Sequence, residues 1–506
     1  MFAITQENRK WWTVAAMALP LFIVCIDFYG ITVALPTIGR ELNTNTTALE
    51  WMVNAFMVGF AALLIPVGRL GDIIGRRKVL LTGTVIFSIA SALCGFAKTD
   101  WWLIAGRAIQ GVGTAMFFAN SLSIVSNAFP TEQRGLGIGT WSAMGIFGGA
   151  IGPLIGGFLT EALSWRWFFF VNIPIAVIAI ALTLVAVLES KDETAEHDID
   201  MVGFITVTIG FVLLVLGIEQ STDFGWGSIF VIGSIIGAVV ILTAFTIIEL
   251  RASNPLIEFG FFRGRDFTKI NCVAFLANYD FGAMMFFLTL YLQHILDFSP
   301  LTTGFVFLAF TVPCVLMSPI AGRVMPHWGA RKCMLLGMQL LTVSFGAFTF
   351  INLTSGVVLV AFGLFVSGIG QGFAYNVSTA AGMAAVPEQK AGAASGVIST
   401  VRMIGLTLGV AVTGTLFKGL ENSKLIELFT NVGANLTSGE RSEVKGLLSG
   451  SDAAQAKLTT LAPEVSHRIE AVVRETFLYA LDGAMIVCLA LSLLGVAAAI
   501  LIKRRN

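Results

Sequence analysis

The stretch GRLGDIIGRRKV, residues 68–79, places three consecutive cations between two long apolar segments. Its pattern GRxxxxxGxRK recurs 254 residues later, as GRVMPHWGARKC at 322–333. A second pair of segments, 111–135 and 368–392, shares two glycines and a proline at an offset of 257. These matches predict two similar halves of six helices each, joined by additional helices.

The composition is that of an integral membrane protein. Hydrophobic residues make up 56% of the 506 residues and charged residues only 12%, whereas a soluble domain has about a quarter charged. The mean hydropathy is +0.84. A membrane-spanning helix needs about 20 apolar residues. We expect fourteen spans, near 12–36, 48–68, 78–97, 101–125, 136–160, 167–189, 201–219, 227–250, 268–292, 303–323, 332–352, 355–380, 392–418 and 477–502.

The distribution of Lys and Arg predicts the orientation in the membrane, because cytoplasmic loops are enriched in both. Nineteen of these residues lie on the side that carries both termini, and the short loops of the other side hold three. We therefore expect cytoplasmic termini and an extracytoplasmic loop at 419–476. Apolar spacing in 464–480 predicts amphipathic helices that cap the exit; alternatively, the loop docks a periplasmic adaptor protein.

Several function classes lack the residues that they need. The six cysteines form no CxxC pair, and the four histidines show no HxxxH or HExxH spacing, so we expect no metal and no cofactor other than protons. A membrane enzyme would need catalytic residues clustered at one interface, and none are found. No basic face indicates nucleic-acid binding.

Five motifs, in order along the expected helices, carry a family resemblance. They are CIDFYGITVALP (25–36), GRLGDIIGRRKV (68–79), LIAGRAIQGVGTA (103–115), GIFGGAIGPLIGG (145–157) and WRWFFFVNIP (165–174). Together they resemble the major facilitator superfamily, and within it the fourteen-helix drug:proton antiporters of the EmrB/QacA type. The chain departs from that pattern twice. No acid lies within 303–321, and Pro326 takes the place that Asp72 has in the first half.

The resemblance implies an all-α membrane protein with the major facilitator fold and helices arranged as 6+2+6. We expect an N-terminal bundle at 1–190, a two-helix insertion with linkers at 191–262, and a C-terminal bundle at 263–506. Two parallel repeats with a site between them are a transporter architecture. The expected function is proton-coupled export of amphipathic or cationic drugs by alternating access, from the bacterial inner membrane, by a monomer. Alternatives are export of an endogenous lipid, siderophore or metabolite, and a non-transporting sensor or adaptor subunit.

Asp27 and Arg107 are the first candidates for proton coupling. A carboxylate in the middle of a membrane helix is costly, so Asp27 should face a cavity or a partner. It is either a proton carrier, a counter-charge for a cationic substrate, or half of a structural ion pair. Arg107 remains charged and cannot carry the proton, but it can stabilise an ionised neighbour. Asp27 is its candidate partner; a backbone carbonyl or Gln110 is the structural alternative.

Asp280 and Arg402 are the second-half candidates for proton coupling. Asp280 lies in ANYDFGAMMFF and is either a second protonation site or the site for a substrate's positive charge. Arg402 either pairs with Asp280 or reaches the interface by snorkelling.

Two glycine-rich motifs predict moving contacts. The resemblance implies that Asp72 and Arg76 form a cytoplasmic latch; alternatively, the cations there only fix the topology. The glycines of the second motif recur every four residues on one helix face, which predicts a close, sliding seam between the halves. The expected gate residues are Gly68, Gly71, Asp72, Gly75, Arg76 and Arg77, and the antiporter motif comprises Gly145, Gly148, Gly149, Gly152, Pro153, Gly156 and Gly157.

Polar, aromatic and methionine side chains inside the expected helices are candidates for lining the substrate cavity. Methionine and aromatic side chains suit a site that accepts many shapes. The candidates are Tyr29, Asn54, Asn120, Asn278, Tyr279, Met284, Gln371, Tyr375 and Asn376.

Overall fold

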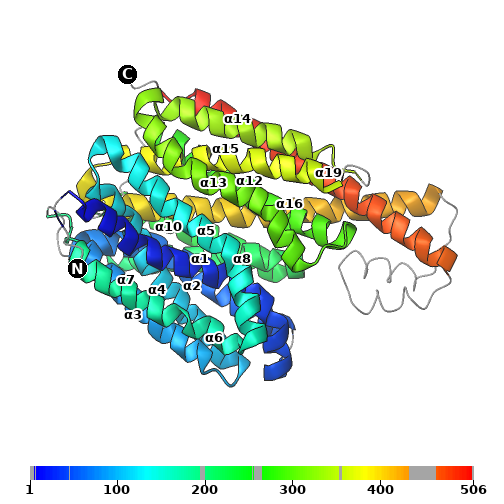
Figure 1. Cartoon of the computed structure of the whole chain (residues 1–506), viewed down its shortest axis with the longest axis horizontal. Helices are drawn as coiled ribbons and strands as arrows, with labels where there is room; N and C mark the ends of the chain where they lie inside the picture. The colour runs from blue at the N-terminus through cyan, green and yellow to red at the C-terminus, as the bar shows by residue number, and fades with distance from the viewer. Residues whose placement is uncertain are drawn as a thin grey trace.

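A computed structural model gives the arrangement of the chain (Figure 1). It describes residues 7–44, 46–193, 200–252, 265–352, 356–431 and 463–503, together with Thr5 and Pro255. Within these residues the ordered elements are all helices. Thirteen of the helices are long and apolar enough to cross a membrane.

The helices of the first half occupy one side of the molecule, shown from blue to cyan in Figure 1. They begin and end as follows: α1 (Arg9–Leu42), α2 (Thr46–Ile74), α3 (Arg76–Gly95), α4 (Asp100–Ala128), α5 (Arg134–Ala162), α6 (Trp165–Phe170) and α7 (Asn172–Ala186), with the 3₁₀ turn η1 (Thr131–Gln133) before α5.

Further helices join the two halves and build the second. The connecting helices are α8 (Met201–Glu219), the single turn α9 (Ser221–Phe224) and α10 (Ile229–Glu249). The second half contains α12 (Arg265–Leu290), the π-helical turn η2 (Tyr291–Ile295), α13 (Pro300–Trp328), α14 (Ala330–Phe348), α15 (Gly356–Ala384), the 3₁₀ turn η3 (Glu388–Lys390), α16 (Ala391–Asn431) and α19 (Pro463–Ile500).

Helix α14 accounts for the difference between the thirteen spans found and the fourteen expected. Helix α14 packs against α15 and α19, in the position expected for a further span, but it is not among the thirteen helices that are long and apolar enough to cross a membrane. It begins with Arg331 and Lys332, and its 19 residues include several polar ones. The fourteen-helix count, its 6+2+6 grouping and the three domain boundaries therefore remain predictions.

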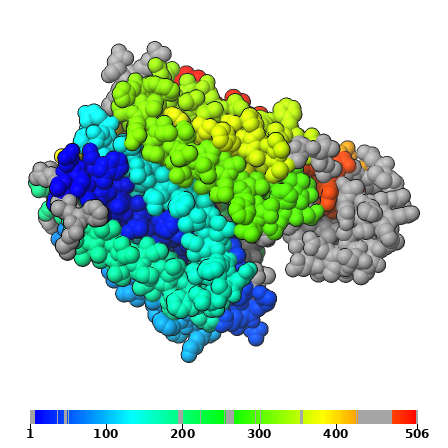
Figure 2. Space-filling view, viewed as in Figure 1, coloured from blue at the N-terminus to red at the C-terminus, as the bar shows by residue number. Residues whose placement is uncertain are grey.

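The two halves pack alike. Helix α1 contacts α4, α5 and α7, and α12 contacts α15, α16 and α19 in the corresponding way. The halves meet where α5 packs on α13 and where α2 packs on α16. Figure 2 shows the first of these contacts at the surface, with the cyan of α5 beside the yellow-green of α13. Helices α8 and α10 pack on each other, and α8 also contacts α2 and α16.

Local sequence explains several helix ends. The side chains of Thr99 and Ser299 accept a hydrogen bond from a backbone N–H in the first turns of α4 and α13, which is the usual N-cap arrangement. Gly75 and Gly329 separate α2 from α3 and α13 from α14, with φ of +116° and +81°. Only glycine adopts such angles readily, so the repeated loop places a glycine at the same turn in each half.

The start of α1 and the end of α19 lie at one end of the molecule, and α16 and α19 extend beyond the other helices at the opposite end (Figure 1). Their extensions form parts of the expected loop 419–476, because α16 continues to Asn431 and α19 already begins at Pro463. Lys424 on α16 lies 3.9 Å from Glu475 on α19. The expected amphipathic helix is therefore the first part of a spanning helix. The remainder of that loop lies outside the described residues.

Candidate functional site

A fully buried ion pair joins two helices inside the first half. Arg107 on α4 donates from Nη1 to the Asp27 carboxylate on α1, and both side chains are 0% exposed. Arg107 Nε also donates to the carbonyl of Met52 at 3.0 Å, and its guanidinium lies over the Phe56 ring, 4.3 Å from the centroid. Asp27 and Arg107 are therefore partners, and the backbone carbonyl contact proposed as the structural alternative is present as well.

Two amides complete the surroundings of Asp27. Gln110 Nε2 donates to Asp27 Oδ1 at 3.0 Å, and Asn172 Nδ2 donates to the same oxygen at 3.2 Å. Ser91 on α3 links the two amides, at 3.0 Å from Asn172 and 3.4 Å from Gln110. The cluster thus draws on α1, α3, α4 and α7. Such bonds compensate for removing an ionised carboxylate from water.

Sequence reasoning did not assign Asn172 or Ser91 a role. Asn172 begins α7 directly after the aromatic run WRWFFF, and Ser91 is one of many small residues in α3. Their spacing along the chain gives no sign that they meet. The one available signal was the polar character of Asn172 within an otherwise apolar motif.

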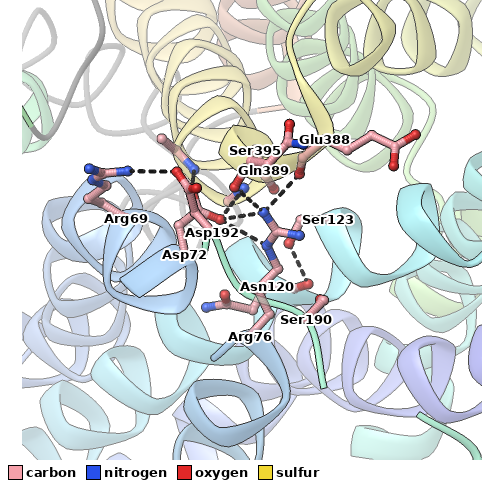
Figure 3. Close-up of polar contacts among 12 residues, drawn as sticks. Arg69, Asp72, Arg76, Asn120, Ser123, Ser190, Asp192, Glu388, Gln389 and Ser395 are labelled. Atoms are coloured by element: carbon pink, nitrogen blue, oxygen red, sulfur yellow. Dashed lines mark hydrogen bonds and ion pairs between the residues drawn. The ribbon is translucent and has the colours of Figure 1, made fainter. Parts of the chain in front are cut away.

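The second feature is a latch between the halves, formed by Asp72, Arg76 and the start of α16 (Figure 3). Asp72 accepts hydrogen bonds from the backbone N–H groups of Gly392 at 2.9 Å and Ala393 at 2.8 Å. These N–H groups belong to the first turn of a helix, where they have no intrahelical partner and favour negative charge. Asp72 is 0% exposed, and its carboxyl group caps this helix turn from across the interface.

Arg76 completes the latch from the first half. It donates from Nε to Asp72 Oδ1 at 2.8 Å, and from Nη2 to the carbonyls of Glu388 at 3.0 Å and Gln389 at 2.7 Å (Figure 3). Arg134 adds an ion pair with the Glu388 carboxylate. A carboxylate and two cations of one half thus hold the backbone and one acid of the other half.

A linker segment also runs across the latch. Asp192 donates its backbone N–H to the Asp72 carbonyl at 2.8 Å, and Arg76 donates its backbone N–H to the Ser190 carbonyl at 3.0 Å. The Asp192 carboxylate lies 3.9 Å from Arg69 (Figure 3). This segment follows α7 and leads toward the inserted helices. The latch therefore also includes the linker residues Ser190 and Asp192, which the sequence did not identify as part of the gate.

Glycines form the seam between the halves, and their contacts repeat. A Cβ on Gly68 of α2 would overlap the Gly392 carbonyl of α16, and one on Gly322 of α13 would overlap the Gly135 carbonyl of α5. The two contacts match at the offsets of 254 and 257 found in the sequence. Such close approach is possible only between helices that carry no side chain at the crossing.

The antiporter motif on α5 lies elsewhere, and the prediction that it forms the seam between the halves was wrong. Gly148, Gly152 and Gly156 face α1 of the same half, where a Cβ would meet Phe22, Ile26 and Gly30 respectively. The remaining motif glycines with close neighbours also face α1: Gly145 faces Leu21, Gly149 faces Tyr29 and Gly157 faces Val33. The four-residue period correctly indicated one small face but could not indicate which helix covers it.

Asp280 and Arg402 in the second half are buried but do not pair. Arg402 donates from Nη2 to the Tyr375 carbonyl at 2.6 Å and also bonds the Thr379 hydroxyl, with its guanidinium 3.6 Å from the centroid of the Tyr375 ring. These contacts leave it neither paired with Asp280 nor extended to the interface, so both predictions for it were wrong. The Asp280 carboxylate is 0% exposed, and neither oxygen has a partner within the described chain.

Several of the residues predicted to line a cavity make hydrogen bonds between helices. Asn120 donates to the Val67 carbonyl at 3.2 Å, Tyr279 bonds Thr413 at 2.9 Å, and Ser367 donates to the Met284 sulfur at 3.1 Å. Others bond within their own helix or against a neighbour: Asn278 to the Ala274 carbonyl, Asn376 to the Gly372 carbonyl, Tyr375 against Arg402, and Tyr29 against Phe28. Gln371 is buried with its Oε1 unbonded, and Asn54 is partly buried.

Two cavities lie away from those residues. One of about 460 Å³ lies between the first residues of α1 and the ends of α4 and α7, and is lined by Arg9, Lys10, Glu189 and Ser190 among others. The other, about 10 Å³, lies between α2, α8 and α16. Neither is lined by a residue predicted for the substrate cavity, so that assignment stays a prediction.

The fold and the latch define a membrane transporter built from two similar halves. The sequence profile of the Major Facilitator Superfamily matches residues 17–410, and the chain belongs to this superfamily. As a multi-pass transporter of this superfamily, it binds small-molecule substrates within the lipid bilayer.

Two relatives are named as multidrug transporters. The multidrug resistance protein Stp of Mycobacterium tuberculosis is 33% identical over 409 residues, covering 80% of this chain and 75% of Stp. The multidrug efflux pump LfrA of Mycolicibacterium smegmatis is 30% identical over 506 residues, covering 97% of this chain and 96% of LfrA. The crystal structure of the human organic anion transporter MFSD10 (TETRAN) aligns with a TM-score of 0.62 over 97% of this chain and 100% of that one; at 12% identity it supports the fold alone.

Proposed function

We propose that this protein exports amphipathic or cationic drugs from the cytoplasm in exchange for protons, by alternating access. The observation that carries the proposal is the buried Asp27–Arg107 pair with its two amide donors. A carboxylate held in this way can release its cation and take up a proton when water reaches it, and an intramembrane acid of this kind is typical of proton relays.

The latch supports the alternating-access part of the proposal. Its contacts join the halves at the end where α1 begins, and separating the halves there would break the bonds of Asp72 and Arg76 together. We propose that this end faces the cytoplasm and that the structure corresponds to a closed inner gate. Relatives named as multidrug transporters, about 30% identical, support drugs as the substrates.

Transport into liposomes tests the proposal. Purified protein in liposomes with an imposed pH gradient should move ethidium, and the direction should reverse when the gradient is reversed. Asp27→Asn should abolish gradient-driven movement while the protein stays monodisperse, and Glu161→Gln, at an exposed acid of α5, should leave it unchanged. Absence of gradient-dependent movement of every compound tested would refute drug–proton antiport, and movement of an endogenous lipid or metabolite alone would favour the alternative export function.

A further inference from the structure

Asp280 occupies in the second half the position that Asp27 occupies in the first. It follows Asp27 by 253 residues, close to the offset of 254 between the repeated loops. Both acids lie in the first helix of their half, and those helices, α1 and α12, make the matching set of helix contacts.

Helix crossings give the corresponding offsets for the helices that surround the two acids. Gly83 of α3 meets Gly113 of α4 at a backbone contact, and in the second half Gly337 of α14 meets Gly370 of α15 in the same way. These pairs are related by offsets of 254 and 257. The same offset of 257 relates Arg107 to Leu364 and Gln110 to Ser367.

The second-half pocket therefore keeps the acid and lacks its partners. Leu364 stands where the first half has its arginine, and Ser367 bonds the Met284 sulfur, not the acid. Both oxygens of Asp280 lack a hydrogen-bond partner among the described residues. The titratable groups nearest to it are the Tyr279 hydroxyl, which bonds Thr413, and the Cys488 thiol of α19, neither of which is cationic.

We infer that Asp280 is a proton-binding site of this transporter and carries its proton in the conformation with the latch closed. An ionised carboxylate that is fully buried without a cation or a donor is far more costly than a neutral carboxyl group. The first half pairs its acid with the Arg107 cation, and the second half holds the equivalent acid protonated.

The proposed exchange involves one O–H bond. A proton from the extracytoplasmic water forms it on the Asp280 carboxylate, and the same bond breaks when the proton leaves to the cytoplasm after the halves have moved. The role in coupling rests on the proposed antiport, whereas the protonation state does not, so the two can be tested separately.

Infrared difference spectroscopy of the purified full-length protein tests the protonation state. Wild-type protein should show the carbonyl stretch of a protonated carboxyl group that disappears on alkaline titration. Asp280→Asn should remove this band, Asp280→Glu should shift it, and Asp27→Asn should leave it in place. A band that persists in Asp280→Asn, or that disappears only in Asp27→Asn, would overturn the assignment.

Chemical labelling gives a second measurement that needs no variant. Dicyclohexylcarbodiimide reacts with protonated carboxyl groups in apolar surroundings, so peptide mapping of the wild-type protein should find the adduct on Asp280. A map without that adduct would contradict the proposal.

Transport tests the coupling role. In liposomes, Asp280→Asn should lose concentrative transport driven by the pH gradient but should still equilibrate ethidium without a gradient. Asp280→Glu should restore the concentrative transport, with a shifted dependence on pH. If Asp280→Asn kept the concentrative transport of the wild-type protein under a pH gradient, the coupling role would be overturned. Absence of transport by the wild-type protein would refute the antiport alone, because the infrared and labelling results stand independently of it.

Discussion

The carboxylate of Asp72 caps the first turn of a helix in the opposite half by accepting the backbone N–H of Gly392 at 2.9 Å. The repeat supplies no equivalent, because Pro326 lies at the matching position of α13. The two inter-half crossings are therefore similar in their glycines and different in their charges, and only the crossing of α2 with α16 carries an anionic cap.

Asp72→Asn should shift the protein toward a state in which the latch is open. The variant loses charge-assisted hydrogen bonds, each worth about 1.5–3 kcal/mol, and such a loss acts fully on the opening equilibrium when the bonds exist only in the closed state. Spin labels on exposed residues Lys78 and His327, at the latch ends of α3 and α13, should show a longer distance. Asp266→Asn, at a partly exposed acid of α12, is the control. Equal label-to-label distances in the wild type, Asp72→Asn and Asp266→Asn would refute the latch.

Arg107→Leu should destabilise the fold by leaving Asp27 buried without its cation. Removing one partner of a buried pair costs about 3–5 kcal/mol, and thermal unfolding of the purified protein measures the loss. The double variant with Asp27→Leu should recover much of the stability, because replacing both partners with apolar residues leaves no buried charge unpaired. A double variant whose loss equals the sum of the two single losses would show that the pair is not coupled.

Gly322→Ala should push the halves apart at the crossing of α13 with α5, because the added Cβ would overlap the backbone of Gly135. We expect slower transport and a latch that closes poorly. Gly304→Ala on the same helix is the matched control, because no atom lies within 4 Å of a Cβ there. Equal transport rates in the two variants would argue against close contact at this crossing.

Glu41 gives a prediction about pH at the opposite end from the latch. Desolvation acts to raise the pKa of its carboxyl, but hydrogen bonds from Arg166 and Trp165 outweigh desolvation and hold the pKa below its ordinary value of 4.5. A depressed folded pKa contributes stability above the unfolded pKa, and this contribution disappears as the pH falls through the folded value. Wild type should therefore exceed Glu41→Gln in melting temperature at neutral pH and converge with it in acid, whereas Glu161→Gln should track wild type throughout.

The sequence predicted the apolar character of the spanning helices and the burial of Asp27, because both follow from local composition. Asp27 was recognisable as a charge within an apolar helix, and its partner Arg107 as the nearest buried cation of the same half. The contacts of Asp72 were harder to predict, since the groups that bind it are backbone N–H groups at Gly392 and Ala393, which no side-chain pattern marks.

The errors have a common cause. Periodicity shows which residues share a helix face, but it does not show which helix covers that face, so the glycines around Gly152 were assigned to the wrong neighbour. Arg402 was expected to pair with Asp280 or to reach the interface. It donates a hydrogen bond to the Tyr375 carbonyl and lies over the Tyr375 ring. Residue type and spacing therefore did not show which neighbouring helix each side chain would contact.

The seam of backbone against backbone also constrains how this protein can be altered. At Gly68 and Gly322 the surface in contact consists of main-chain atoms, whose shape does not depend on residue type. Side chains inside each half can therefore be redesigned without changing the shape of this seam, whereas no side-chain change at the seam can compensate for a lost glycine.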